Sequence, residues 1–143
     1  MFVKLSDQVW VSAQITVDDV AQAAAQGIAL IVNNRPEDES ADQTPGAAIA
    51  AAAADAGLAY VAIPVGQGGF SEPQVAALGK ALDEAKGPIL AYCRSGTRST
   101  LLWSLAQASR GLAPDAIAAQ AANAGYDISP VRALVDMLAA RAG

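Results

Sequence analysis

Short, continuous apolar runs alternate along this chain with longer segments that mix alanine with polar residues. Runs of about four to eight residues rich in Val, Ile and Leu are typical of strands buried on both faces, whereas the longer mixed segments have the length of helices. The pattern predicts strands over residues 8–12, 28–33, 58–65 and 88–92. It predicts helices over residues 16–26, 45–56, 71–85, 100–110, 114–124 and 129–141.

Two of the predicted helices carry a start signal. Asp19 follows Thr16, and Gln74 follows Ser71, at the spacing of a capping box. In such a box the hydroxyl accepts a hydrogen bond from a backbone N–H in the first turn, and the longer side chain bonds back to the cap. These two helix starts are therefore predicted from local hydrogen bonding as well as from hydrophobic pattern.

The alternation of strands and helices predicts an α/β fold with a central, mostly parallel sheet and helices on both faces. The stretch 47–65 is apolar enough to resemble a membrane span, but Asp55, Gly57 and Pro64 interrupt it, so we interpret it as a helix followed by a strand. Ligands of parallel sheets bind at the carboxyl ends of the strands. We therefore expect a site among residues 34–40, 66–70 and 93–98.

The most informative of these segments is the strand-to-helix turn that contains Cys93, the only cysteine in the chain. Arg94 and Arg98 flank it, and Gly96 lets the backbone curl. Backbone N–H groups converge in such a turn, and the helix N-terminus adds partial positive charge. This environment favours a bound anion and a thiolate form of Cys93.

Length and charge limit the class of protein. The chain has 143 residues, of which 53% are hydrophobic, and this predicts a single domain over residues 1–143. The chain has only nine Lys and Arg residues and a net charge of −5. We therefore expect no basic face that would bind nucleic acid and no polybasic segment that would bind anionic membranes. No basic region precedes an apolar run near the N-terminus, so we expect no signal peptide and a cytoplasmic location.

The absence of histidine narrows the chemistry further. With one cysteine and no histidine, the chain has no internal disulfide, no Cys/His zinc site and no Cys-His or Ser-His-Asp catalysis. We therefore expect neither a metal nor a cofactor. Backbone, arginine, hydroxyl or carboxylate groups must activate Cys93.

Several segments together carry a family resemblance. They are residues 11–14 (Val-Ser-Ala-Gln), 31–37 (Ile-Val-Asn-Asn-Arg-Pro-Glu), 60–65 (Tyr-Val-Ala-Ile-Pro-Val) and the cysteine turn. The chain resembles the bacterial phosphatase-like family that occurs alone or fused to beta-lactamase-fold hydrolases, which is similar to dual-specificity protein tyrosine phosphatases. The resemblance implies that Cys93 attacks phosphorus, that Arg98 clamps the phosphate and that Ser99 helps the thiolate leave.

The cysteine turn departs from the phosphatase pattern in two ways. Arg98 lies five positions after Cys93, whereas the phosphatase signature places this arginine six positions after its cysteine. The shorter turn resembles the active loop of single-domain rhodaneses, which carry sulfur as a cysteine persulfide. In addition, residues 66–70 contain no carboxylate where dual-specificity phosphatases keep a general acid. A phosphatase of this kind is expected to be slow or to borrow an acid from residues 37–39.

The sequence thus predicts a cysteine-dependent phosphatase-like hydrolase that forms a thiophosphate intermediate at Cys93. A persulfide-forming sulfurtransferase that uses the same cysteine, or a non-catalytic anion-binding module, remains an alternative. The expected partner is a small anionic substrate, either a phosphate ester or a sulfane sulfur donor. The expected catalytic residues are Cys93, Arg98 and Ser99; the anion-binding residues are Arg94, Ser95, Gly96, Thr97 and Arg35; the candidate general acids are Glu37, Asp38 and Glu39.

Overall fold

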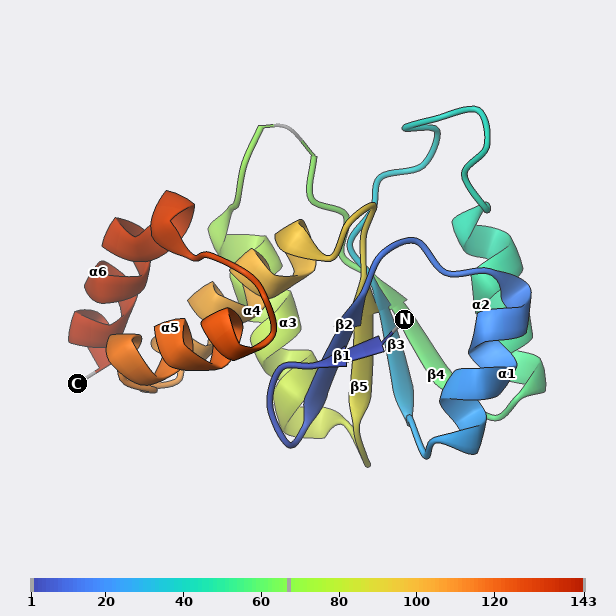
Figure 1. The fold of residues 1–143 in the computed structure, drawn as a ribbon, viewed down its shortest axis with the longest axis horizontal. Helices are drawn as coiled ribbons and strands as arrows, with labels where there is room; N and C mark the ends of the chain where they lie inside the picture. Colours follow the sequence, from blue (N-terminus) through green and yellow to red (C-terminus); the bar gives the residue numbers. More distant parts are fainter. Residues whose placement is uncertain (1, 67, 143) are drawn as a thin grey trace.

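A five-stranded sheet forms the centre of the molecule, with helices on both of its faces (Figure 1). The computed structural model describes residues 2–66 and 68–142. The strand order is β1-β2-β5-β3-β4. The four strands β2, β5, β3 and β4 run parallel, and β1 pairs antiparallel with β2 at one edge. The strands are β1 (Phe2–Lys4), β2 (Val9–Ser12), β3 (Leu30–Asn33), β4 (Ala59–Ala62) and β5 (Ile89–Tyr92).

The predicted strands are confirmed, with two differences at the sheet edges. The pattern did not predict β1, because two half-buried residues and the exposed Lys4 form no apolar run. Strand β4 ends at Ala62, three residues before the predicted end. Ile63 and Val65 still donate backbone hydrogen bonds to Asn33 and Asn34, at 2.9 Å each. The chain therefore leaves the regular ladder at Pro64, which has no N–H to donate.

All six predicted helices are present. Thr16 and Asp19 form the predicted capping box, and the Ser71 box is also present. Helix α4 begins at Thr97, three residues earlier than predicted, because Gly96 (φ +88°) ends the turn directly before it. The last predicted helix opens with a 3-10 turn, η1 (Ser129–Val131). The α-helices are α1 (Val17–Ala25), α2 (Gly46–Asp55), α3 (Glu72–Glu84), α4 (Thr97–Ser109), α5 (Pro114–Asn123) and α6 (Arg132–Ala142).

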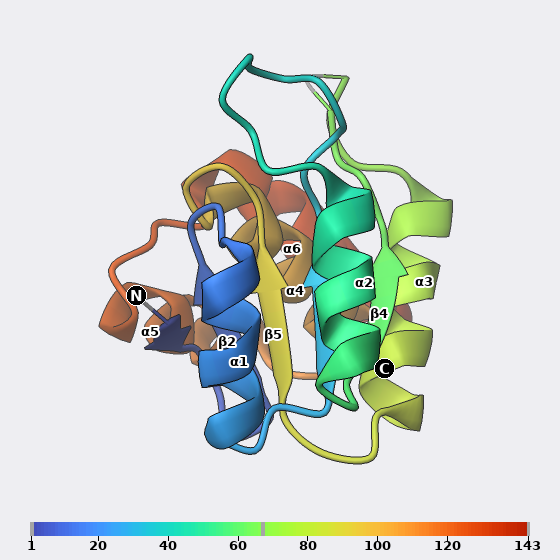
Figure 2. The same ribbon diagram turned by 90° about the vertical axis from the view of Figure 1, so that its right-hand side faces the viewer.

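The two faces of the sheet are covered by unequal layers (Figures 1 and 2). Helices α1 and α2 lie on one face and α3 to α6 on the other. Side chains alternate between the layers, so that Leu90 packs toward α1 and α2 while Ile89 and Ala91 pack toward α4. Helix α4 is buried almost all round, and its Trp103 is 1% exposed. The larger cluster thus anchors the helix that follows the cysteine turn.

The loops that follow β3, β4 and β5 meet at the same edge of the sheet, as predicted for parallel strands (Figure 1). Gln14, just after β2, joins them by donating its backbone N–H to the Arg94 carbonyl, at 3.3 Å. Four segments far apart in sequence therefore surround Cys93. None of the helices in the described ranges is long and apolar enough to cross a membrane.

Candidate active site

Cys93 lies directly after the buried strand β5 and before the first turn of α4. Its backbone N–H bonds to the carbonyl of Ser12 on β2, at 3.4 Å, and this contact ties the turn to the sheet. Cys93 is fully buried.

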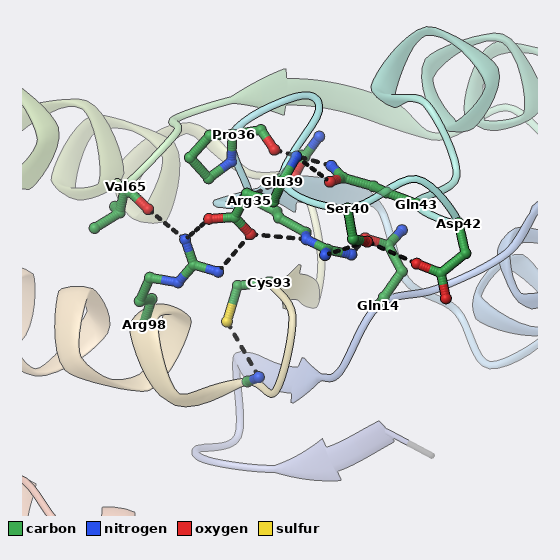
Figure 3. Close-up of polar contacts among 12 residues, drawn as sticks. Gln14, Arg35, Pro36, Glu39, Ser40, Asp42, Gln43, Val65, Cys93 and Arg98 are labelled. Atoms are coloured by element: carbon green, nitrogen blue, oxygen red, sulfur yellow. Dashed lines mark hydrogen bonds and ion pairs between the residues drawn. The ribbon is translucent and has the colours of Figure 1, made fainter. Parts of the chain in front are cut away.

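The turn directs a backbone N–H group at the sulfur. Gly96 donates its N–H to Cys93 Sγ at 3.1 Å (Figure 3). Gly96 adopts φ +88°, a left-handed conformation that residues with a Cβ rarely adopt. The carbonyl of the same residue accepts hydrogen bonds from the backbone N–H and the hydroxyl of Thr100, at 3.0 and 2.9 Å. Gly96 therefore serves both as the helix cap and as a donor to the sulfur.

Arg98 extends from the first turn of α4 to two other loops. Its Nη1 donates to Glu39 Oε2 and to the Val65 carbonyl, both at 2.7 Å, and its Nη2 donates to Glu39 Oε1 at 2.8 Å. Hydrogen bonding to Glu39, and next the charge of that carboxylate, raise the pKa of Arg98, and the neighbouring Cys93 adds to the shift. The guanidinium is thus fixed in one orientation and stays charged.

One edge of the Arg98 guanidinium remains open. A guanidinium has five N–H donors, and the contacts with Glu39 and Val65 use three of them. The remaining donors are Nε–H and the second hydrogen of Nη2, which lie on the same edge. Among the described residues no oxygen or nitrogen accepts from this edge, and Figure 3 shows it facing Cys93. The arrangement therefore offers a planar fork to an anion beside the sulfur.

Glu39 is held as a carboxylate between two arginines. Besides Arg98, Arg35 donates its Nε–H to Glu39 Oε1 at 2.8 Å. The hydrogen bond from Arg98 is the main cause that lowers the pKa of Glu39 from 4.5 to about 2. An ionised carboxylate has no proton to donate at neutral pH. In this arrangement Glu39 holds Arg98 in place, a positioning contact beside its predicted role as a general acid.

Each side-chain nitrogen of Arg35 is bonded to a neighbouring side chain. It is 4% exposed, and its three side-chain nitrogens donate to Glu39, Gln14 and Ser40, at 2.8 to 3.1 Å (Figure 3). Its backbone N–H donates to Asn33 Oδ1 at 2.9 Å. Arg35 thus supports Glu39, and its predicted role as an anion ligand stays a prediction.

The two other candidate acids lie in different surroundings. Glu37 Oε1 accepts the backbone N–H of Gly46 at 2.9 Å, at the start of α2, where Pro45 offers no side-chain cap. Asp38 is exposed and adopts φ +62°. Neither carboxylate bonds to Arg98 or to the cysteine turn in the described contacts. The structure therefore brings only Glu39, of the three, next to Arg98.

Ser99 is fully buried below the turn. Its hydroxyl donates to Asn34 Oδ1 at 2.8 Å, and the Asn34 side-chain amide donates to the Ile63 carbonyl at 2.9 Å. These bonds link α4 to the ends of β3 and β4. The Ser99 hydroxyl is used in that link, so the structure gives it a positioning contact beside its predicted catalytic role.

The outer residues of the turn face solvent. Arg94, Ser95 and Thr97 are exposed, and the Ser95 hydroxyl donates to Thr97 Oγ1 at 3.1 Å. The Ser95 carbonyl accepts a hydrogen bond from the Tyr126 hydroxyl at 3.2 Å. At the turn, the structure therefore places Cys93, Gly96 and Arg98 inside the cradle and these three residues on its rim.

Some residues of the site were not among the predicted site residues. Gln14 and Asn34 belong to the segments that carry the family resemblance, so their motifs were the available signal. Val65 takes part only through its carbonyl. Tyr126 contacts the turn from the connection after α5, and no local sequence pattern indicates this contact. In the loop predicted at 66–70, Gln67 lies outside the described residues. Within the described ranges, no group of three or more acidic, cysteine or histidine side chains is arranged to hold a metal ion.

The sequence of the chain matches a family model over residues 2–110, that of the phosphatase-like domain of the beta-lactamase hydrolase-like protein. The chain belongs to this family. A curated relative, the beta-lactamase hydrolase-like protein of Xylella fastidiosa strain Temecula1, is 32% identical over 127 residues. That match covers 88% of this chain and 30% of the relative. The chain thus spans about a third of the length of this relative.

Solved structures share the whole fold. A Neisseria meningitidis Z2491 protein described as a candidate phosphatase is 33% identical, with a TM-score of 0.83 over 95% of this chain and 96% of that one. At lower identity the likeness concerns the fold alone. Tk-PTP is 15% identical, with a TM-score of 0.77 over 98% and 97% of the two chains. Pseudomonas aeruginosa TpbA, solved in complex with pTyr, is 17% identical, with a TM-score of 0.67 over 99% and 89%. The fold is that of protein tyrosine phosphatase-like enzymes.

Proposed function

We propose that this protein is a phosphatase that hydrolyses phosphate monoesters through a covalent intermediate on Cys93. The observation that carries the proposal is the open Nε/Nη2 edge of Arg98 beside a sulfur that already accepts a backbone N–H from Gly96. Membership in a phosphatase-like family supports the reaction class. The pTyr bound to TpbA supports phosphate esters as the substrate class.

The chemistry takes two steps. In the first, the Cys93 thiolate attacks phosphorus, an S–P bond forms, and the P–O ester bond breaks as the alcohol or phenol leaves with its electron pair. In the second, water attacks the phosphocysteine, the S–P bond breaks, and inorganic phosphate is released with the thiolate restored. The Arg98 edge and the Gly96 N–H stabilise the negative charge that spreads over the phosphoryl oxygens in both steps.

None of the three candidate acids is placed to donate a proton to the leaving group. Glu39 is ionised, Glu37 bonds to the start of α2, and Asp38 is exposed. A phenolate carries negative charge well enough to leave without a general acid, whereas an alkoxide needs protonation. The proposed phosphatase therefore prefers aryl phosphates over alkyl phosphates, with solvent supplying the proton.

The length of the cysteine turn favours a second candidate function, sulfur transfer. With Arg98 five positions after Cys93, the turn holds one residue fewer than the phosphatase signature, and a smaller ring suits a single sulfur atom. In that reaction the Cys93 thiolate attacks the outer sulfur of a persulfide donor, the donor S–S bond breaks, and the donor leaves as a thiolate. An acceptor thiolate then removes the sulfur from Cys93.

One parallel measurement separates the two functions. Purified protein and Cys93→Ser are assayed for release of phosphate from an aryl phosphate and for sulfur transfer from glutathione persulfide, with mass spectrometry of the intact chain. The proposal expects phosphate release that needs Cys93, and no stable mass gain of one sulfur atom. Persulfide on Cys93 that passes to an acceptor, without phosphate release, would replace the first function with the second. If neither activity is found, the protein would instead be a non-catalytic anion-binding module.

A further inference from the structure

The C-terminal part of the chain contributes one residue to the cysteine turn. The family match ends at residue 110, and Tyr126 lies beyond it, in the connection between α5 and η1. Its hydroxyl donates to the Ser95 carbonyl at 3.2 Å. Neither the family match nor the proposed chemistry gives this tyrosine a role.

The connection that carries Tyr126 is fixed at both ends. On one side, Tyr126 N–H bonds to the Ala121 carbonyl at 2.9 Å, directly after Gly125 with φ +93°. On the other side, the Asp127 carboxylate accepts hydrogen bonds from the backbone N–H and the hydroxyl of Ser129, at 2.9 and 2.6 Å. The backbone on both sides of Tyr126 is therefore fixed, and the hydroxyl joins the ring to the turn.

The bond to Ser95 acts on the donor that faces the sulfur. The Ser95 carbonyl and the Gly96 N–H belong to one peptide unit, which is planar and trans, so they point in opposite directions. Tyr126 holds the carbonyl on the outer side, and the Gly96 N–H on the inner side bonds to Cys93 Sγ at 3.1 Å. A hydrogen bond accepted at one end of a peptide also strengthens the donor at its other end.

The Tyr126 hydroxyl lies close to the Gly96 Cα as well as to the Ser95 carbonyl. A Cβ at position 96 would collide with the Tyr126 hydroxyl, so the glycine leaves room for the phenol as well as for the left-handed backbone. Burial and the charge of Cys93 raise the pKa of Tyr126, so the phenol keeps its proton and remains a donor at neutral pH.

We propose that Tyr126 is a positioning residue for the cradle, which aligns the Ser95–Gly96 peptide so that its N–H stabilises the Cys93 thiolate. This inference rests on Cys93 being the nucleophile of the proposed function. It assigns part of the site to the helical segment after residue 110, and it holds for either reaction of the thiolate.

The test compares Tyr126→Phe with Tyr60→Phe. Tyr60 is also half-buried, and its hydroxyl accepts a hydrogen bond from Asn33 at 3.0 Å; in the described contacts it bonds to no residue of the turn 93–98. Each variant loses one oxygen atom and one hydrogen bond. The readouts are the alkylation rate of Cys93 with iodoacetamide, the NMR resonance of the Gly96 amide proton and the urea midpoint of unfolding. None of them needs a substrate, so the outcome is independent of whether the phosphatase assay succeeds.

We expect Tyr126→Phe to slow alkylation about three- to ten-fold and to shift the Gly96 amide proton upfield, because one hydrogen bond is lost from the peptide that faces the sulfur. Tyr60→Phe should leave both signals unchanged. A Tyr126→Phe protein with the alkylation rate and Gly96 resonance of the wild type would overturn the proposal. So would a Tyr60→Phe protein in which both signals change as much, because general loosening would then explain them.

Discussion

At the scale of single residues, the site depends on how Arg98 is held. Glu39 and the Val65 carbonyl take three of its donors and leave the edge that faces Cys93. An arginine fixed in this way needs no reorganisation when an anion binds, which is the condition for electrostatic stabilisation of a transition state. The pairing with Glu39 therefore prepares the arginine for an incoming phosphoryl group.

Arg98→Lys should lower kcat/KM for an aryl phosphate about 100- to 1,000-fold, because an ammonium group has no planar fork to offer to both Glu39 and a phosphoryl group. Steady-state kinetics measures the loss. Arg110→Lys is the matched control, since Arg110 pairs with Asp83 on the surface at 2.9 Å, away from the turn. Equal kinetics for Arg98→Lys and the wild type would remove Arg98 from the mechanism.

At the scale of secondary-structure elements, two helix starts show how the site edge is built. The N-cap residue of α4 is Gly96, which has a left-handed backbone, and that of α2 is Pro45, which has no capping side chain. In each case another segment contacts the helix start: the Tyr126 hydroxyl lies against Gly96 and donates to the Ser95 carbonyl, and Glu37 accepts the N–H of Gly46. The loops at the sheet edge are therefore fastened to the helices as well as to one another.

Gly96→Ala should destabilise the fold more than Gly111→Ala. Both glycines have a left-handed φ, +88° and +94°, so both substitutions carry a backbone cost of about 1–2 kcal/mol. A Cβ at position 111 meets nothing, whereas one at position 96 meets the Tyr126 hydroxyl. We expect about 1–3 kcal/mol more loss in the unfolding free energy for Gly96→Ala, measured in urea. Equal losses would mean that Tyr126 yields without cost.

Glu37→Ala should weaken α2 and leave catalysis intact. The lost cap is expected to cost about 0.5–2 kcal/mol in unfolding free energy. Phosphate release should stay within about two-fold of the wild type, because Glu37 bonds to Gly46 and not to the turn. Asp38→Asn, which removes an exposed carboxylate next to it, is the control for loop charge. A fall of about 100-fold in rate for Glu37→Ala would identify it as the general acid after all.

At the scale of the whole molecule, the site joins three separate loops across one edge of the sheet. Glu39 connects the loop after β3 to Arg98 on α4, and Val65 adds the loop after β4. Because Glu39 is ionised with a pKa of about 2 instead of 4.5, its ion pair also stabilises the folded state. That contribution is fully present above pH 4.5 and is lost as the pH falls toward 2.

Glu39→Gln should therefore destabilise the protein at pH 7 by about 1–3 kcal/mol, since an amide replaces a carboxylate among charged donors. The difference from the wild type should shrink between pH 4.5 and 2.5, where the wild type loses the same interaction. Urea unfolding at several pH values measures it. Asp7→Asn, which removes an exposed partner of Lys4, should have little effect at any of these pH values. A difference that does not depend on pH would show that Glu39 acts through packing alone.

The sequence alone determined the layered α/β fold, the helix starts at Thr16 and Ser71, and the place of Cys93 in a strand-to-helix turn. These features rest on local causes: hydrophobic periodicity, capping hydrogen bonds and the turn chemistry of glycine. The edge strand β1 and the early start of α4 were not predicted, because neither has an apolar pattern of its own.

Only the tertiary structure decided what each polar side chain at the edge does. Among Glu37, Asp38 and Glu39, which are adjacent in sequence, only Glu39 meets Arg98, and this contact keeps it ionised. Arg35 is a residue type that often binds anions, yet it is buried and each of its side-chain nitrogens donates to a neighbouring side chain. Tyr126 reaches Ser95 across a separation of 31 residues. Such contacts form only where the folded chain brings distant segments together, and no local sequence pattern shows which segments these are.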